Sequence, residues 1–543
     1  MNRKYAIGVL VLLCAGAAGW FGMRTVEKTT EQAVAEALAS VPAQAREIRY
    51  SLLENTLTLK GVTYEFSGGD ILRRGSVDSV EVKGFNRKYV FTKSDAPYRA
   101  DDLPLVAEAI AATGIVDSMQ MDGTKVEQRV EKVRLTGWYQ RLGTLLTLNA
   151  QNRGDEAFFE ELYRCRIDGM EIDGVSMALS EADAPSARIG VEEISFPDGM
   201  RAPRDGEKVA PVSVRFDGIH VSGKDFSGAL RKLEFRDVLA PDPDVLAAFF
   251  RIFGEGDNFE DDDLRYLAEN KLISDIENLL LKNYENRVPI RRMLAEGGSL
   301  SLQDTPEEQG AKPAVFSMDM KSFDYRLSLT EEGAIRDATN LSGLKMNFPD
   351  SMEEADILSR YAPEGLILNV TSNSLLADDE LSGKARYELE GLGVLEGSLD
   401  IVGDIRALQR AVLEGDPSGE VDRLMQSVRL KGMNVICRDS GLLPMSVEIA
   451  ARWSGSTVEN ELKELSALLQ KMAQDKERPV RECGAALLEQ LERPGEFVMT
   501  IAPERPMNFM EIIALASMNP DALPVTFGSR PGEKALTDYL PKK

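Results

Sequence analysis

The chain has 543 residues, of which 43% are hydrophobic and 28% are charged, and its net charge is −25. This composition is typical of a folded protein, and the length allows about three domains, or fewer if one is an extended β structure. The acidic excess argues against nucleic-acid binding and against a polybasic membrane-surface patch, because both need an excess of lysine and arginine.

An apolar run opens the chain at residues 5–23, preceded by Arg3 and Lys4 and closed by Arg24. Its length lies within the ~17–25 residues that cross a bilayer as a helix. Because the positive charge precedes the run, residues 1–4 are predicted to stay in the cytoplasm and everything after Arg24 to be exported. We therefore expect a single-pass protein of the bacterial inner membrane with most of its chain in the periplasm.

The N-terminal run has two other possible interpretations. A cleaved signal peptide is an alternative, because residues 15–17 supply the small side chains that such a site needs. Lipid attachment at Cys14 is disfavoured, because the bulky Leu13 lies where a lipoprotein signal has a small residue. Trp20 and Phe21 favour an uncleaved anchor, since aromatic side chains concentrate at membrane interfaces.

A short pattern recurs along the chain: apolar, any, apolar, any, glycine or aspartate, apolar. Its fifth position is occupied by Gly61, Gly84, Gly137, Gly169, Gly218, Asp237 and Gly432. Alternation with a period of two indicates a strand with one buried face. A glycine at a constant point permits positive φ, which predicts a bulge that shifts the apolar face. The spacing between repeats varies, which favours a long antiparallel meander over a regular solenoid.

Residues 385–401 show the one-sided character of the strands most clearly. Ala385, Tyr387 and Leu389 alternate with charged residues, and glycines follow. Apolar residues then occur again at alternate positions, including Leu395 and Leu399. The pattern predicts a hairpin with one apolar and one charged face.

Helices are expected to interrupt these strands. A capping box of Ser456 and Glu459 opens a helical hairpin, and Pro479 begins its second helix. Helices are predicted at residues 103–113, 244–253, 261–279, 352–361, 405–413, 456–493 and 508–518.

These elements predict an α+β fold: an extended, curved antiparallel β-sheet with one apolar face, interrupted by amphipathic helices, behind a single N-terminal transmembrane helix. The predicted segments are a cytoplasmic tail (1–4), a transmembrane anchor (5–23), a helical stalk (24–44), a β-rich region (45–240), a helical insertion (241–300), a second β-rich region (301–404), mixed helix and strand (405–455), a helical hairpin (456–493), and a C-terminal strand, helix and tail (494–543).

Little in the chain points to catalysis. His220 is the sole histidine, so a multi-histidine metal site is excluded, and its alternating surroundings predict a strand residue. The acidic cluster at residues 255–263 lacks the order of a calcium loop and is interpreted as a solvated helix start. Ser342 and Lys345 have S-x-x-K spacing but lack the partner motifs, and the glycines at 391–397 match a turn. We expect no catalytic, cofactor-binding or metal-binding residues.

Sulfur-containing residues add two observations. Cys165, Cys437 and Cys483 follow the anchor, so at most one intramolecular disulfide forms and one thiol is left over. Methionines on strand faces suit either an ordinary core or an adaptable apolar surface for lipid. They are Met170, Met177, Met318, Met320, Met346, Met433 and Met499.

The segment YSLLENTLTLKGVTYEF with SVEVKGF after it, behind an anchor and stalk, resembles the start of AsmA-like bacterial envelope proteins. The later run LILNVTSNSLLADDELSGKARYELEGLGVLEGSLDIVGD resembles these proteins in its pattern of strands and glycines. The resemblance implies an inner-membrane anchor, a curved periplasmic sheet with an apolar groove, and a role in phospholipid transport or outer-membrane homeostasis. The expected helical insertions depart from that pattern, and the family offers no catalytic residues to match.

Three functional hypotheses follow. The leading one is a non-enzymatic, membrane-anchored periplasmic protein that binds phospholipid or another apolar envelope component. The second is an envelope scaffold, in which helices close a conventional core and the acidic exterior meets protein partners. The third is a hydrolase of envelope polymers that works through paired carboxylates. The expected partners are the membrane, through the N-terminal helix, a phospholipid ligand and an envelope protein, and no nucleic acid.

Overall fold

The computed structural model describes residues 31, 35, 43–52, 54–68, 71–84, 86, 99–121, 124–140, 164–181, 184–204, 210–239, 291–304, 314–330, 334–377, 379–405, 407 and 427–540. The chain divides into two compact units, Met1–Arg292 and Met293–Lys543. The predicted anchor, most of the stalk, the acidic cluster and most of the helical insertion lie outside the described residues. Within the described ranges, no helix is long and apolar enough to cross a membrane.

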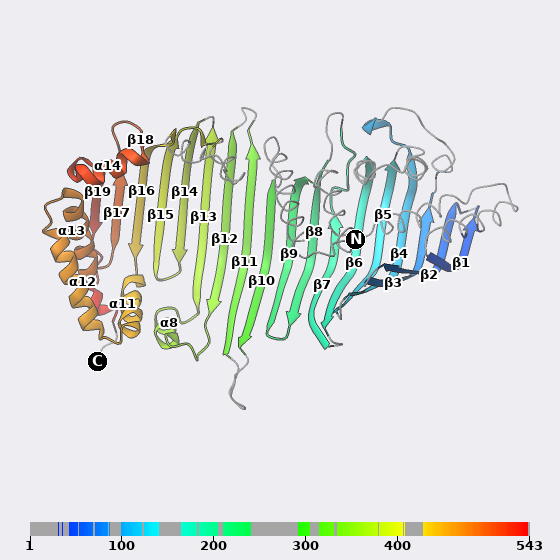
Figure 1. The fold of residues 1–543 in the computed structure, drawn as a ribbon, viewed down its shortest axis with the longest axis horizontal. Coiled ribbons are helices and arrows are strands. Elements are labelled where there is room, and N and C mark those ends of the chain that lie inside the picture. Colours follow the sequence, from blue (N-terminus) through cyan, green and yellow to red (C-terminus); the bar gives the residue numbers. More distant parts are fainter. Residues whose placement is uncertain are drawn as a thin grey trace. The chain divides into compact units, whose positions relative to one another are not determined.

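The first unit is built from an open, curved antiparallel sheet (Figure 1). Each strand from β1 to β9 pairs with the next one along the chain. The strands are β1 (Ala43–Ser51), β2 (Thr56–Gly68), β3 (Ile71–Lys83), β4 (Leu105–Met121), β5 (Thr124–Gln140), β6 (Cys165–Glu181), β7 (Ala184–Phe196), β8 (Pro211–Gly223) and β9 (Phe226–Leu239). These strands pair as the predicted antiparallel meander, and nearly all of their residues lie within the segment 45–240 that was predicted to be β-rich.

Apolar side chains line up across the strands of the first unit. Residues opposite each other on antiparallel strands point to the same face, so the register groups them into rows. One row is entirely apolar and consists of Ile48, Leu59, Val80, Ala112, Val133, Ile172, Ile194, Phe216 and Leu233. Its members on β2 and β3 belong to a buried cluster with Leu57, Val62 and Trp138.

The second unit also contains an open antiparallel sheet. Consecutive strands pair from β11 to β17, β19 pairs with β17, and the short β18 pairs with one end of β16. The strands are β10 (Arg292–Asp304), β11 (Ala314–Leu329), β12 (Ile335–Asn347), β13 (Leu366–Ala377), β14 (Glu380–Leu389), β15 (Gly393–Val402), β16 (Arg429–Asp439), β17 (Glu496–Ile501), β18 (Met507–Asn508) and β19 (Val525–Arg530). β14 and β15 form the predicted hairpin.

The α-helices that the structure describes over their whole length all lie in the second unit: α8 (Ala355–Tyr361), α11 (Leu442–Trp453), α12 (Val458–Ala473), α13 (Arg478–Glu492) and α14 (Phe509–Met518). α12 and α13 confirm the helical hairpin, although its N-cap differs from the prediction. The Thr457 side chain, rather than Ser456, accepts a hydrogen bond from the backbone of Asn460. α13 lies against the edge strand β19, where Arg478 donates to the Val525 carbonyl at 2.9 Å. A helix beside an edge strand protects it from pairing with another chain.

One helix prediction and one segment boundary were wrong. Residues 103–113 were predicted to be helical, yet most of them lie in β4, which pairs with β3 and β5 along its length. Alanine has the highest intrinsic helix propensity, but such propensities are small in free energy, and the hydrogen-bonded ladders on both sides of β4 outweigh them. The predicted helical insertion (241–300) was given too late an end, because residues 292–300 belong to β10.

Most of the predicted bulge positions have the expected backbone. Positive φ occurs at Gly61, Gly84, Gly137, Gly218 and Asp237 but not at Gly169 or Gly432. Gly432 instead lies beside a register shift between β15 and β16. Gly343 on β12 has φ of 59° and also lies at a register shift, with its amide donating to the Asn369 side chain at 2.7 Å.

Gly343→Ala is expected to destabilise the second unit by about 1–2 kcal/mol, because a Cβ atom disfavours the left-handed conformation. The nearest atom to the new Cβ, at 2.6 Å, is the Lys321 Cδ on a flexible side chain that is able to move. In Gly397→Ala the nearest atom is 4.0 Å away and φ is not positive, so stability should stay equal or rise by up to about 1 kcal/mol. Hydrogen exchange of β12 and β15 peptides measures both effects, and equal losses would contradict the bulge interpretation.

Candidate functional site

The sheet of the second unit has one face made mostly of apolar side chains, which we call the apolar face. The register from β11 to β17 defines it as four rows. The first row is Phe323, Leu341, Val370, Tyr387, Leu395, Cys437 and Phe497. The second row is Tyr325, Thr339, Ser372, Ala385, Gly397, Val435 and Met499. The third row is Leu327, Asp337, Ser374, Gly383, Leu399, Met433 and Ile501. The fourth row is Ile335, Leu376, Leu381, Ile401 and Leu430.

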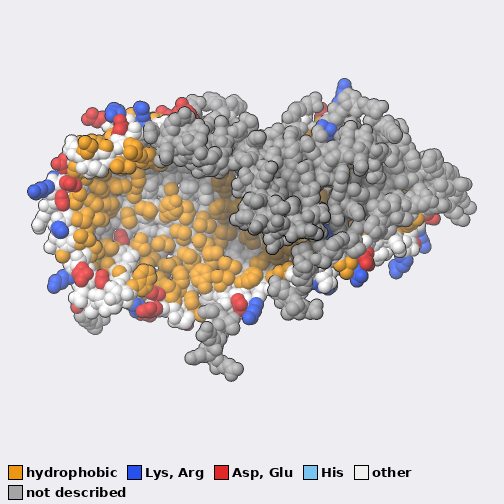
Figure 2. Space-filling view, viewed as in Figure 1, with side chains coloured by type: hydrophobic (Ala, Val, Ile, Leu, Met, Phe, Trp, Pro, Cys, Tyr) orange, Lys and Arg blue, Asp and Glu red, His pale blue; other side chains and the backbone are white. Residues whose placement is uncertain are grey.

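Part of this apolar face is open to solvent. Tyr387, Leu395 and Leu399 remain 46%, 43% and 37% exposed. Figure 2 shows hydrophobic side chains gathered over the region of β13–β17, at the left of the view. Contiguous exposed apolar surface is typical of a binding site, because burial would remove it from water.

The reverse side of the same strands is charged. Arg386 pairs with Glu388 at 2.9 Å and with Glu396 on the next strand. Arg438 continues the network to Glu396 at 3.0 Å and to Glu496 at 2.9 Å. Exposed ion pairs contribute little stability, so their main effect is to keep this side in water and leave the other side as the apolar one.

Helices cover one end of the apolar face. Ile357 and Leu358 of α8 and Met445 of α11 form a buried cluster against which Leu366 and Leu389, at the strand ends, are packed. At the opposite end, Leu376 of the fourth row is buried with Ile405 and Val428. The exposed residues Tyr387, Leu395 and Leu399 lie in the first and third rows, between these two clusters.

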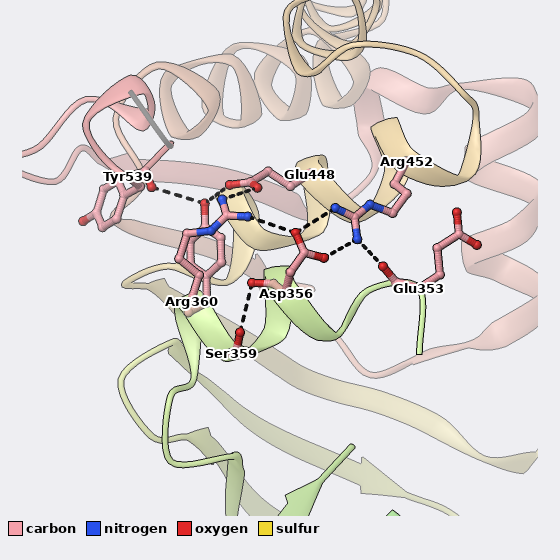
Figure 3. Close-up of polar contacts among 8 residues, drawn as sticks. Glu353, Asp356, Ser359, Arg360, Glu448, Arg452 and Tyr539 are labelled. Carbon is pink, nitrogen blue, oxygen red and sulfur yellow. Dashed lines mark hydrogen bonds and ion pairs between the residues drawn. The ribbon is translucent and has the colours of Figure 1, made fainter. Parts of the chain in front are cut away.

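A polar cluster joins α8 to α11 at the covered end (Figure 3). The Glu448 carboxylate accepts hydrogen bonds from Arg360 at 2.7 Å and from the Tyr361 hydroxyl at 2.6 Å. Burial raises the pKa of Tyr361 well above its usual range, and the adjacent Glu448 raises it further. Arg452 of α11 donates to the Asp356 carboxylate, with one bond of 2.9 Å, and to the Glu353 carbonyl. The cluster stabilises the two helices that border the open part of the apolar face.

The Asp356 and Arg452 pair should make stability depend on pH. The Arg452 guanidinium lowers the pKa of Asp356 from 3.8 to about 2. A lowered folded-state pKa stabilises the fold above the unfolded-state value, and this contribution is lost as the pH falls from about 4 towards 2. Asp356→Asn should therefore lower the urea midpoint at pH 7, with the difference from the wild type vanishing near pH 2. Asp400→Asn, which removes a charge elsewhere in the same unit, is the control, and a pH-independent difference would contradict the pair's role.

The residues singled out in the sequence are placed on strands and turns. His220 is an exposed residue of β8 whose Nδ1 lies 3.0 Å from the Gly218 carbonyl. Ser342 and Lys345 lie on β12, and Gly391 forms the turn between β14 and β15 with φ of 76°. Among the described side chains, no three potential ligands lie together in a way that would hold a metal ion.

Cys165, Cys437 and Cys483 are free thiols. Burial raises the pKa of the Cys165 thiol to about 11, so little of the reactive thiolate forms near neutral pH. Burial, and secondarily Asp439, raises the pKa of Cys437, which belongs to the first row of the apolar face. Burial also raises the pKa of Cys483.

Two features of this region were not anticipated from the sequence. Arg360 and Glu448 are separated by 88 positions, so no local pattern links them. The sequence around Asp337 does not alternate between apolar and polar residues, so only the strand register places it on the apolar face.

Comparison with known proteins adds one match. A family model described only as an uncharacterized protein matches residues 386–530, which extend from β14 to β19 and include α11–α14. No curated protein matches the chain.

Proposed function

We propose that this chain is a non-enzymatic, membrane-anchored protein of the bacterial envelope that binds phospholipid acyl chains on the apolar face. The observation that carries the proposal is the partial exposure of Tyr387, Leu395 and Leu399 on a face whose reverse is charged. Acyl chains need continuous apolar surface, and the aligned rows of the sheet supply it.

The location of the protein is part of the same proposal. The apolar run at residues 5–23 anchors the chain in the inner membrane, and the acidic remainder lies in the periplasm. There the protein takes part in lipid transport or in maintaining the outer membrane.

Site-specific photocrosslinking in the full chain tests the proposal. A benzophenone amino acid replaces Leu399, and a matched variant carries it at Ser398. These neighbours point to opposite sides of β15, because successive strand residues alternate. After irradiation of cells, mass spectrometry should find phospholipid attached at position 399 and not at position 398. Equal labelling at both positions, or no lipid at either, would refute the proposal.

An envelope scaffold is the second candidate, and the exposed α14 favours it. Met510, Ile513 and Met518 of this short apolar helix all point to solvent. Recovery of one protein partner crosslinked at position 399 in a fixed ratio to this chain, without lipid, would support the scaffold role instead.

A further inference from the structure

Asp337 is the only charged residue in the four rows that define the apolar face. On β12 it lies opposite Leu327 of β11 and Ser374 of β13. The same row continues through Gly383 to the exposed Leu399. The Asp337 carboxylate therefore points to the same side of the sheet as the proposed acyl-chain surface.

No cation neutralises this carboxylate within the part of the chain that the structure describes. Its one hydrogen bond there comes from the Ser374 hydroxyl. The carboxylates of Glu388, Glu396 and Glu496 on the charged side are each paired with an arginine. A carboxylate on an apolar surface is unfavourable without a partner, so a bound cation would gain a strong interaction here.

Leu327 lies on the β11 side of Asp337, whereas the side chains towards β13 and β14 are small and mostly polar. Thr339 and Ser372 occupy the adjacent second row, and Gly383 follows Ser374 in the third row. All of the side chains at positions 337, 339, 372 and 374 are partly buried. One carboxylate with nearby hydroxyl acceptors matches a primary ammonium group, which carries three hydrogen-bond donors.

We propose that Asp337 binds the protonated amine of a lipid headgroup while the acyl chains of that lipid lie on the neighbouring apolar rows. This inference rests on the proposed function and adds selectivity to it. The carboxylate attracts the ammonium group of an ethanolamine-type headgroup and repels a purely anionic headgroup. The attraction and the repulsion both favour the amine-bearing lipid.

The test uses the full chain with the benzophenone at position 399, reconstituted in vesicles of equal phosphatidylethanolamine and phosphatidylglycerol with identical acyl chains. The wild-type Asp337 background should give about a tenfold excess of ethanolamine adduct, the size expected for one charge-assisted hydrogen bond. Asp337→Asn should bring the adduct ratio close to one, and Asp337→Glu, which keeps the charge, should retain most of the preference. Asp400→Asn, on the charged side of β15, should leave the ratio unchanged.

The outcomes separate this inference from the proposed function. Adducts of both lipids without preference, or a preference that Asp337→Asn leaves intact, would overturn the role of Asp337 and leave acyl-chain binding in place. Preference for the glycerol headgroup would overturn it as well. Absence of any lipid adduct would overturn both proposals.

Discussion

Leu59→Ala is expected to destabilise the first unit by about 2–5 kcal/mol, the range for removing a fully buried leucine. Leu59 is 0% exposed and lies between Ile48 and Val80 in the apolar row that crosses the sheet. Truncation there removes apolar contacts and leaves a cavity that the paired strands on both sides cannot easily close.

Ile189→Ala is the matched control for this substitution. Ile189 lies on β7 of the same unit and is 41% exposed, so the same kind of truncation should cost about 1 kcal/mol or less. Hydrogen exchange of β2 and β3 peptides in the full chain measures the loss for this unit alone, since the two units need not unfold together. Similar losses for both variants would show that Leu59 is not part of a tightly packed core.

Glu448→Ala is expected to destabilise the second unit by about 2–3 kcal/mol and to loosen α8 from α11. The substitution leaves Arg360 without this carboxylate, and the Tyr361 hydroxyl keeps only the Tyr539 carbonyl at 3.3 Å. This loss of stability is smaller than for breaking a fully buried ion pair, because the Arg360 side chain is partly exposed.

Glu448→Gln separates the loss of the charge from the loss of the hydrogen bond. The amide oxygen still accepts from Tyr361, so the loss of stability should be smaller than for alanine. The pKa of Tyr361 should fall, because the charge that raises it is gone, yet stay above its usual value because burial is the larger cause. Hydrogen exchange of α8 and α11 peptides reports the loosening, and unchanged exchange in the alanine variant would rule out a clamping role for the cluster.

Loosening of these helices bears on the proposed function. Leu366 and Leu389 are packed under α8 and α11, so detachment would enlarge the exposed part of the apolar face. Lipid crosslinking at position 399 in Glu448→Ala would therefore report whether the covered end limits the site.

Much of the fold of the second unit could be predicted because the informative patterns are local. Alternation around Tyr387 and Leu395 predicted the β14 and β15 hairpin, and the structure pairs these two residues directly. The helical hairpin of α12 and α13 was predicted in the same way from a period of three to four residues. Residues 103–113 were wrongly predicted to be helical. Their alanines favour a helix locally, but strand pairing on both sides of β4 outweighs this preference.

The sequence by itself determined that the strands are one-sided, where several of them bulge and where the chain turns, since these properties depend on neighbouring residues. Only the tertiary structure decided that Asp337 shares a face with Leu399 and that Glu448 meets Arg360. Both depend on strand register and helix packing between distant segments, where a shift of one residue would move a side chain to the opposite face.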